Sequence, residues 1–281
     1  MDNFNFNINN KHLLEGDDVE QMNCPKNTVR FSAGMPDTIV LHYTAGRSGR
    51  ASAQYLCKDK VRASAHLVVD RDGKVFQLVP FDTVSWHAGK SRWKGRTGLN
   101  QYSIGIEIDN AGVLTKSGTA YTSWFGKKYA ADEVMEAVHR NESKARYWHL
   151  FTEKQIEAVE ALCDLLIDRY PAIKEILGHE EISPGRKQDP GPAFPLDKLR
   201  ERILNDRDDV GAPLNNPPGV VNVPFLNIRQ LPDIKAGKVA EPLPQGTDLT
   251  IFEEHDGWYR VRAEIEGWVA SRYVELKPKS E

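Results

Sequence analysis

The stretch "TIVLHY" (residues 38–43) is a continuous apolar run, rich in β-branched side chains, with a histidine near its end. Such a run is typical of a strand buried on both faces of a sheet. The stretch "SIGIEID" (103–109) repeats the pattern, but Glu107 falls inside it. A buried histidine and a buried carboxylate each need a partner, because burying an unpaired polar group is costly.

Neighbouring segments extend this pattern. Residues 66–70 and 75–79 are strand-like and flank an Asp-Gly pair, which predicts a β-hairpin. Thr152 and Gln155 form a capping-box pattern that opens an amphipathic helix, and Pro171 ends it. Further helices are expected over residues 131–140 and from Pro195 through Leu199 and Ile203. Strands and helices together predict an α/β layer structure.

The C-terminal part of the chain has a different texture. Residues 205–219, "NDRDDVGAPLNNPPG", carry three prolines and almost no large apolar side chains, as linkers do. Beyond them, short alternating segments separated by turn residues predict a small all-β barrel. We therefore expect a catalytic domain over residues 1–205, a linker over 206–219 and a second domain over 220–281.

Composition excludes several classes of protein. The net charge of -3 gives no electrostatic reason to expect nucleic acid as a ligand. Three cysteines without a repeated spacing support neither a disulfide framework nor a four-cysteine zinc site. We expect no membrane span and no classical signal peptide, because no apolar run is long enough and the N-terminus is polar. We therefore expect a chain that is cytoplasmic at synthesis and that reaches the cell wall only after lysis or export by a non-Sec route; we also expect a monomer.

The stretch "GHEEISPGRKQDPGPAF" (178–194) places His179, Lys187 and Asp189 among three prolines and three glycines. The prolines limit the conformations of this loop, so its side chains need little reordering when a ligand arrives. If the loop folds over the ends of the two buried strands, His42, Glu107, His179 and Asp189 converge. Two imidazoles and a carboxylate that leave one position for water are a recurrent zinc arrangement, which predicts a metal site.

Each of these residues also has a structural interpretation. His42 can be a structural histidine, and Glu107 can form a salt bridge rather than act as a base. Asp189 before Pro190 can simply begin a turn, and Lys187 can be a solvated cation. The dispersed spacing alone does not choose between these alternatives.

The motifs around these residues resemble the zinc N-acetylmuramoyl-L-alanine amidase family, in the branch that uses His, His and Asp. The fold of that family is shared with peptidoglycan recognition proteins and T7 lysozyme. The motifs are "IVLHYTAG", "SAHLVVDRDGKVFQLVPFDTVSWHAG", "NQYSIGIEIDN" and the 178–194 loop, which together cover most of residues 38–194. The resemblance implies a mixed central β-sheet flanked by helices.

The resemblance also implies roles. His42, His179 and Asp189 would bind Zn²⁺, Glu107 would be the catalytic base, and Lys187 would stabilise the oxyanion. His87 in "WHAG" would contact substrate, or alternatively pack with Trp86, and His66 is expected to be structural. The reaction would be hydrolysis of the amide between N-acetylmuramic acid and L-alanine of the stem peptide, so the partners would be peptidoglycan or muropeptides.

Two segments lie outside this core. Residues 111–148 form a longer insertion than the compact family members have, and its Trp124, Phe125 and Tyr129 either stack on sugars or pack on the domain. The C-terminal segment resembles a bacterial SH3-like domain through "LNIRQLP", "GWYRVRA" and "GWVASRYVEL". Such a domain would bind cell-wall peptide and raise the local concentration of the catalytic site, or be purely architectural.

Three functional hypotheses follow. The first is a zinc amidase that acts on polymeric peptidoglycan. The second is a cytosolic amidase that recycles soluble anhydro-muropeptides, which the missing signal peptide favours and the wall-binding type of appendage disfavours. The third is a peptidoglycan-binding protein without catalysis, which the complete set of five site residues argues against.

Overall fold

A computed structural model describes residues 4–22, 24–25, 28–205, 218–232, 234–255 and 258–263. The chain divides into two compact units, one that holds residues 4–205 and another that holds most of residues 218–263. The exact domain boundaries stay a prediction, because most of the expected linker lies outside the described residues.

A six-stranded mixed sheet forms the centre of the first unit, in the order β15-β4-β9-β5-β6-β3. β15, β4, β9 and β5 run parallel, β5 and β6 form the predicted antiparallel hairpin, and β3 pairs in parallel with β6. The strands are β3 (Val19–Gln21), β4 (Thr38–Tyr43), β5 (Leu67–Val69), β6 (Val75–Gln77), β9 (Ser103–Ile108) and β15 (Glu175–Gly178). The expected mixed sheet is confirmed.

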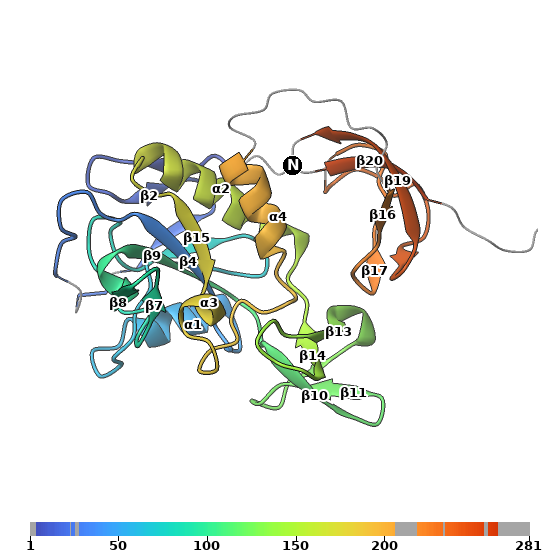
Figure 1. Ribbon diagram of the computed structural model, residues 1–281, viewed down its shortest axis with the longest axis horizontal. Coiled ribbons are helices and arrows are strands. Elements are labelled where there is room, and N and C mark those ends of the chain that lie inside the picture. Colours follow the sequence, from blue (N-terminus) through green and yellow to red (C-terminus); the bar gives the residue numbers. More distant parts are fainter. Residues whose placement is uncertain are drawn as a thin grey trace, which may run out of the picture. The chain divides into compact units, whose positions relative to one another are not determined.

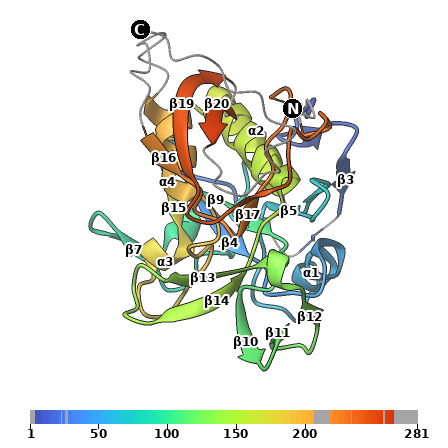
Figure 2. The same ribbon diagram turned by 90° about the vertical axis from the view of Figure 1, so that its right-hand side faces the viewer.

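The two faces of this sheet have different covers. Helix α2 (Glu153–Arg169) packs its apolar stripe on the face that carries Ile39, Leu41 and Ile106. Helix α1 (Gly49–Leu56) packs on the opposite face, against Val68 and Phe76. Figures 1 and 2 show the sheet between these two helices. Because side chains alternate along a strand, His42 and Glu107 point to the face away from α2.

Two of the three predicted helices are present in the structure, and the third is not. α2 begins at the expected capping box of Thr152 and Gln155, whose side chains bond each other's backbone N–H. The helix after Pro195 is also present, as α4 (Leu196–Arg200) followed by a π-helical turn (Glu201–Asn205). The helix expected over residues 131–140 is wrong: a 3-10 turn (Ala131–Glu133) leads into strand β13 (Val134–Val138). Pairing with β14 over five residues overrides the local preference for helix.

The inserted segment forms a sheet of its own, in the order β12-β11-β10-β14-β13. Its other strands are β10 (Val113–Ser117), β11 (Ala120–Thr122), β12 (Lys128–Tyr129) and β14 (Ala145–His149). All its pairings are antiparallel. Tyr129 is 6% exposed and packs on the domain, whereas Trp124 is 77% exposed.

Smaller elements complete the first unit. They are β1 (Asn7–Ile8), β2 (Leu14–Glu15), β7 (Arg92–Trp93), β8 (Arg96–Thr97), a 3-10 turn (Leu99–Gln101) and α3 (His179–Ile182). In the described part of the chain, no helix combines the length and apolarity that crossing a bilayer requires.

The second unit is all-β where it is described, as the sequence predicts. β16 (Pro218–Val220), β19 (Asp248–His255) and β20 (Trp258–Ala263) form one antiparallel sheet. β17 (Phe225–Leu226) pairs with β18 (Leu243–Pro244). The predicted strand "GWVASRYVEL" lies outside the described residues.

Candidate functional site

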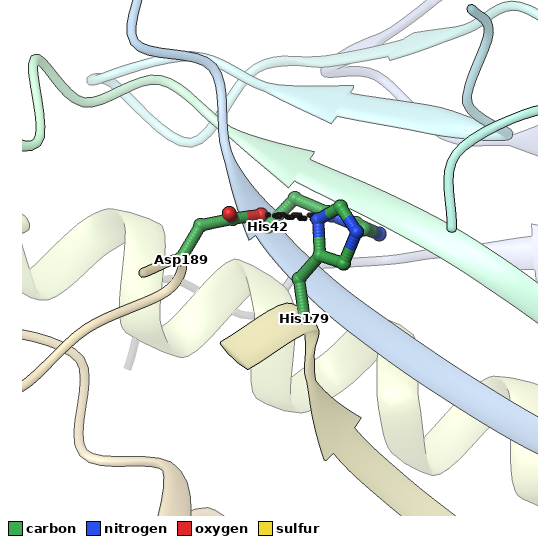
Figure 3. A group of neighbouring side chains, drawn as sticks. All are labelled: His42, His179 and Asp189. Atoms are coloured by element: carbon green, nitrogen blue, oxygen red, sulfur yellow. Dashed lines mark hydrogen bonds and ion pairs between the residues drawn. The ribbon is translucent and has the colours of Figure 1, made fainter. Parts of the chain in front are cut away.

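Three of the predicted site residues meet at one point. His42 lies near the end of β4, His179 follows β15 directly, and Asp189 lies on the proline-rich loop. Gly178 is the register partner of Leu41 in the parallel β15–β4 pair, and a histidine follows each of these two residues in the chain. Figure 3 shows the two imidazoles and the carboxylate pointing toward one another. This is the one grouping of metal-type ligands found among the described residues.

The geometry of these side chains fits a small divalent cation. His42 Nδ1 lies 2.9 Å from His179 Nδ1 and 3.0 Å from Asp189 Oδ2, and His179 Nδ1 lies 2.8 Å from the same oxygen. Tetrahedral zinc, with ligands at about 2.0–2.2 Å, separates its ligand atoms by roughly 3.3 Å, close to these spacings. All three residues are at least nine-tenths buried. The predicted ligands therefore form a compact donor set of two nitrogens and one oxygen.

The neighbours of His179 determine which of its nitrogens is free. Its Nε2 lies 3.1 Å from the carbonyl oxygen of Ala88, which can only accept a hydrogen bond. Arg186 Nη2 lies 3.3 Å from the same nitrogen but has shorter contacts with Lys90 O and Ser183 Oγ. His179 Nε2 therefore carries the proton, and the lone pair of Nδ1 faces the cluster.

The tautomer of His42 is determined in the same way, by a chain of hydrogen bonds through His87; we call this chain the His87 relay. His87 Nε2 lies 3.1 Å from the carbonyl oxygen of Ser103, so that nitrogen donates and His87 Nδ1 accepts. His42 Nε2 lies 2.9 Å from His87 Nδ1 and must then be the donor. The lone pair of His42 Nδ1 is thereby aimed at the cluster. Burial, reinforced by the nearby His179, lowers the pKa of His42 to about 4, which keeps it neutral as a ligand must be.

The position of the His87 ring requires a glycine at residue 105. A Cβ at Gly105 would lie 2.3 Å from Cγ of His87, so a larger residue there would push the ring away. Both ring nitrogens of His87 are occupied by protein groups, although His87 also borders the cleft. The contact of His87 with substrate stays a prediction. In the structure, His87 hydrogen-bonds to His42. Trp86 is 40% exposed.

Glu107 is the register partner of His42 on the adjacent strand β9. Its Oε2 is buried and accepts no hydrogen bond from any described residue. Burial, and then the nearby Asp189, raise the pKa of Glu107 well above the usual carboxyl value, whereas Lys187 lowers it. No salt bridge holds this carboxylate in the described part of the chain. It has the properties expected of a general base beside the predicted metal ligands.

Lys187 lies in the same cleft, which has a volume of about 530 Å³ and is also lined by Glu107, His179 and Asp189. Lys187 is half-buried and forms no ion pair with a described residue. A cation in this position can act on charge that develops in the cleft. His66 is structural, as expected: its Nε2 donates to Thr83 O, and its Nδ1 accepts from Gly105 N.

The sequence did not predict a contact between Glu180 and His139 that supports the 178–194 loop; we call it the Glu180 brace. Glu180 is 2% exposed, and its Oε2 accepts from His139 Nε2 and from the backbone N–H of Gly191, both at 2.9 Å. His139 follows β13 of the inserted sheet, and its Nδ1 accepts from Asn141 N. The insertion thus contacts the loop between two of the predicted metal ligands, His179 and Asp189. The only sign of this contact in the sequence is that an ionisable residue, Glu180, lies next to His179.

Comparison with known proteins places these residues in a family. The chain is 35% identical to the 1,6-anhydro-N-acetylmuramyl-L-alanine amidase AmpD of Escherichia coli over 149 residues, covering 53% of this chain and 61% of that protein. It is 33% identical to the N-acetylmuramoyl-L-alanine amidase AmiD of Escherichia coli over 172 residues, covering 58% and 52%. The chain thus spans between half and two thirds of the length of these relatives.

A solved complex of Escherichia coli AmiD with anhydro-N-acetylmuramic acid-L-Ala-D-gamma-Glu-L-Lys is 30% identical, with a TM-score of 0.45 over 66% of this chain and 61% of that one. Residues 224–275 match the bacterial SH3 domain. Residues 32–192, more than half of the chain, match the family model of N-acetylmuramoyl-L-alanine amidase. The chain therefore belongs to the N-acetylmuramoyl-L-alanine amidase family.

Proposed function

We propose that this protein hydrolyses the amide between the lactyl group of N-acetylmuramic acid and L-alanine of the stem peptide in peptidoglycan. The observation that carries the proposal is the convergence of His42, His179 and Asp189, with Glu107 and Lys187 lining the same cleft. Family membership and the names of the relatives support it.

His42, His179 and Asp189 would hold Zn²⁺ through His42 Nδ1, His179 Nδ1 and a carboxylate oxygen. Bound there, Zn²⁺ supplies Lewis acidity, which polarises the scissile carbonyl and eases ionisation of a water molecule. The hydrogen bonds of His87 and of Ala88 O keep both imidazoles in the tautomer that binds a cation.

Glu107 would take a proton from the attacking water and pass it to the nitrogen of L-alanine as the amide bond breaks. Its lack of a bonding partner among the described residues leaves Oε2 available for both transfers. Lys187 would place its charge beside the carbonyl oxygen as that oxygen becomes negative, an interaction that grows in the transition state.

The C-terminal unit supports action on the polymer. A bacterial SH3 domain that binds cell-wall peptide weakly would raise the effective concentration of the catalytic cleft at the wall. Its described strands identify no ligand pocket, so wall binding rests on the family match.

The test is a parallel digestion of insoluble sacculi and soluble anhydro-muropeptides, followed by mass spectrometry of new L-alanine amino termini. Cleavage of both substrates is expected, with sacculi cleaved more slowly after removal of residues 220–281. Cleavage of soluble fragments alone would establish the recycling hypothesis, and binding without new amino termini would establish a non-catalytic protein.

A further inference from the structure

Trp124, in the inserted sheet, makes a specific contact with the catalytic cleft although its side chain is 77% exposed. Its Nε1 donates a hydrogen bond to the carbonyl oxygen of Ala45 at 2.8 Å. Ala45 is one of the residues that line the cleft. A tryptophan that stabilises a fold does so mainly by burying its large ring, which Trp124 does not do. The hydrogen bond to Ala45, rather than burial of the ring, is therefore the interaction to explain.

The turn that carries Trp124 is closed by its own hydrogen bonds. Residues 123–127 join β11 to β12, and the N–H of Ser123 donates to Lys127 O at 2.9 Å. The N–H of Gly126 donates to Ser123 O at 2.9 Å, and the N–H of Lys127 donates to Ser123 Oγ at 3.1 Å. Gly126 has a φ of 87°, which glycine adopts without strain. The turn therefore holds the backbone of Trp124 in a defined position.

A second hydrogen bond joins the same turn to the loop that follows β4. Arg47 Nη2 donates to Phe125 O at 3.2 Å, and the guanidinium of Arg47 lies over the Phe125 ring, 5.2 Å from its centre. The rings of Trp124 and Phe125 meet edge to face, with their centres 5.5 Å apart. The turn thus contacts this loop at two residues, Ala45 and Arg47.

Ala45 has a backbone conformation that needs support. Its φ is 48°, in the left-handed region that residues with a Cβ rarely adopt, and such a conformation persists only where its surroundings hold it. Ala45 follows the predicted metal ligand His42 by three residues. Before it, the N–H of Thr44 donates to Ile108 O, and after it, Ser48 caps the N-terminus of α1. Between these two anchors, the indole of Trp124 holds the carbonyl group of Ala45 itself.

We propose that Trp124 is a positioning residue: its hydrogen bond to Ala45 O keeps the loop of residues 43–46 in the conformation that shapes the catalytic cleft. Without this bond, Ala45 relaxes toward negative φ in part of the molecules. The remaining fraction has the competent cleft, and the apparent affinity for substrate falls with that fraction. The inserted sheet then acts on the cleft from outside it. This inference rests on the proposed amidase function.

The kinetic test combines two substitutions. Trp124→Phe keeps an aromatic ring and removes the N–H donor, so kcat/KM for a soluble muropeptide should fall by about 2–10-fold, as the loss of one hydrogen bond predicts. Ala45→Gly removes the cost of the positive φ. In the Ala45→Gly protein, Trp124→Phe should therefore lower kcat/KM by less than about 2-fold. An equal loss with Ala45 and with Gly at residue 45 would overturn the inference, because Trp124 would then act in another way, such as direct contact with substrate.

Amide hydrogen exchange across residues 43–48 tests the contact without catalysis. Trp124→Phe should speed exchange at Gly46, whose N–H donates to Thr44 Oγ1 at 3.2 Å. The matched control is Trp93→Phe, which removes an indole donor to Glu175 Oε2 outside the cleft and should leave this exchange unchanged. Unchanged exchange in Trp124→Phe would overturn the inference. A wild-type protein that cleaves no muropeptide would overturn the amidase proposal, whereas the exchange experiment would still test the contact.

Discussion

His42 and Glu107 are direct register partners in the parallel β4–β9 pair, yet only His42 belongs to the metal cluster. Alternation along both strands sends the two side chains to the same face of the sheet. The carboxylate that completes the cluster instead comes from Asp189, which lies 2.8 Å from His179 Nδ1. Metal binding and proton transfer are therefore assigned to different carboxylates, and mutation can separate them.

Glu107→Gln should retain zinc and lose turnover. The substitution keeps the shape of the side chain but removes the base, so kcat should fall by about 10²–10⁴-fold. Asp189→Ala should lose zinc and activity together, because it removes a ligand. Elemental analysis after dialysis and a single-turnover assay measure the two properties, with Glu136→Gln on the exposed side of β13 as the control. A Glu107→Gln protein with near-normal kcat would end the assignment of the base.

Lys187→Gln should move the acid limb of the rate profile to higher pH. Glu107 must be ionised to act as a base, so the rate rises with pH through its pKa. Burial and Asp189 raise that pKa and Lys187 lowers it, so removing Lys187 raises it further. The maximal rate should also fall, by about 10²–10³-fold, if Lys187 stabilises the oxyanion. Profiles of kcat/KM between pH 5 and 9 measure both effects.

The matched control for Lys187 is Lys90→Gln, since Lys90 is exposed and does not line the cleft. It should leave the acid limb in place. A Lys187→Gln limb that stays in place or moves to lower pH would contradict the electrostatic coupling between Lys187 and Glu107.

His87→Ala should weaken zinc binding although His87 touches no metal. The loss of its Nδ1 acceptor frees the tautomer of His42, and partners of this kind typically contribute 10–100-fold in metal affinity. Gly105→Ala should have a similar effect, because its Cβ displaces the His87 ring. Competition with a chromophoric chelator measures the affinity. His149→Ala, another buried histidine, should lose stability but keep zinc affinity, and equal affinities in all three variants would exclude the relay.

The sequence predicted the central strands and α2 because their signals are local: apolar runs of strand length and a capping box. It also predicted that His42, His179 and Asp189 converge, because His42 is a polar residue in a buried strand and the other two lie on a proline-rich loop. The strand over residues 134–138 was missed because its pairing with residues 145–149 is a tertiary contact. The His87 relay and the Glu180 brace were missed because each joins residues that are far apart in the chain.

His139→Ala should slow catalysis because it loosens the 178–194 loop, which carries Asp189. It removes the donor to Glu180 Oε2, which also accepts from the backbone of Gly191, two residues after Asp189. Looser positioning of Asp189 should speed zinc dissociation and lower kcat by about 10-fold, with KM unchanged, because misplaced groups lose rate rather than affinity. Stopped-flow release of zinc to a chelator reports this effect. Ala substitution of exposed Glu136 on the adjoining strand should change neither rate, and an unaltered release rate in His139→Ala would refute the brace.

Asp109→Asn should stabilise the unliganded protein at neutral pH. Burial raises the pKa of Asp109 from 3.8 to about 6, so its ionisation opposes folding. A carboxyl with a raised folded-state pKa loses stability as pH rises from its unfolded pKa to its folded pKa, and the loss is complete above the latter. The variant should therefore equal the wild type near pH 4 and exceed it by roughly 1–3 kcal/mol at pH 7.5.

Calorimetric unfolding of the larger unit at both pH values measures the difference, with Asp72→Asn as the exposed control. A wild-type protein that is more stable than Asp109→Asn at pH 7.5 would show that a charge within the protein already compensates Asp109. The expected opposite result would show that the ionised Asp109 carboxylate opposes folding.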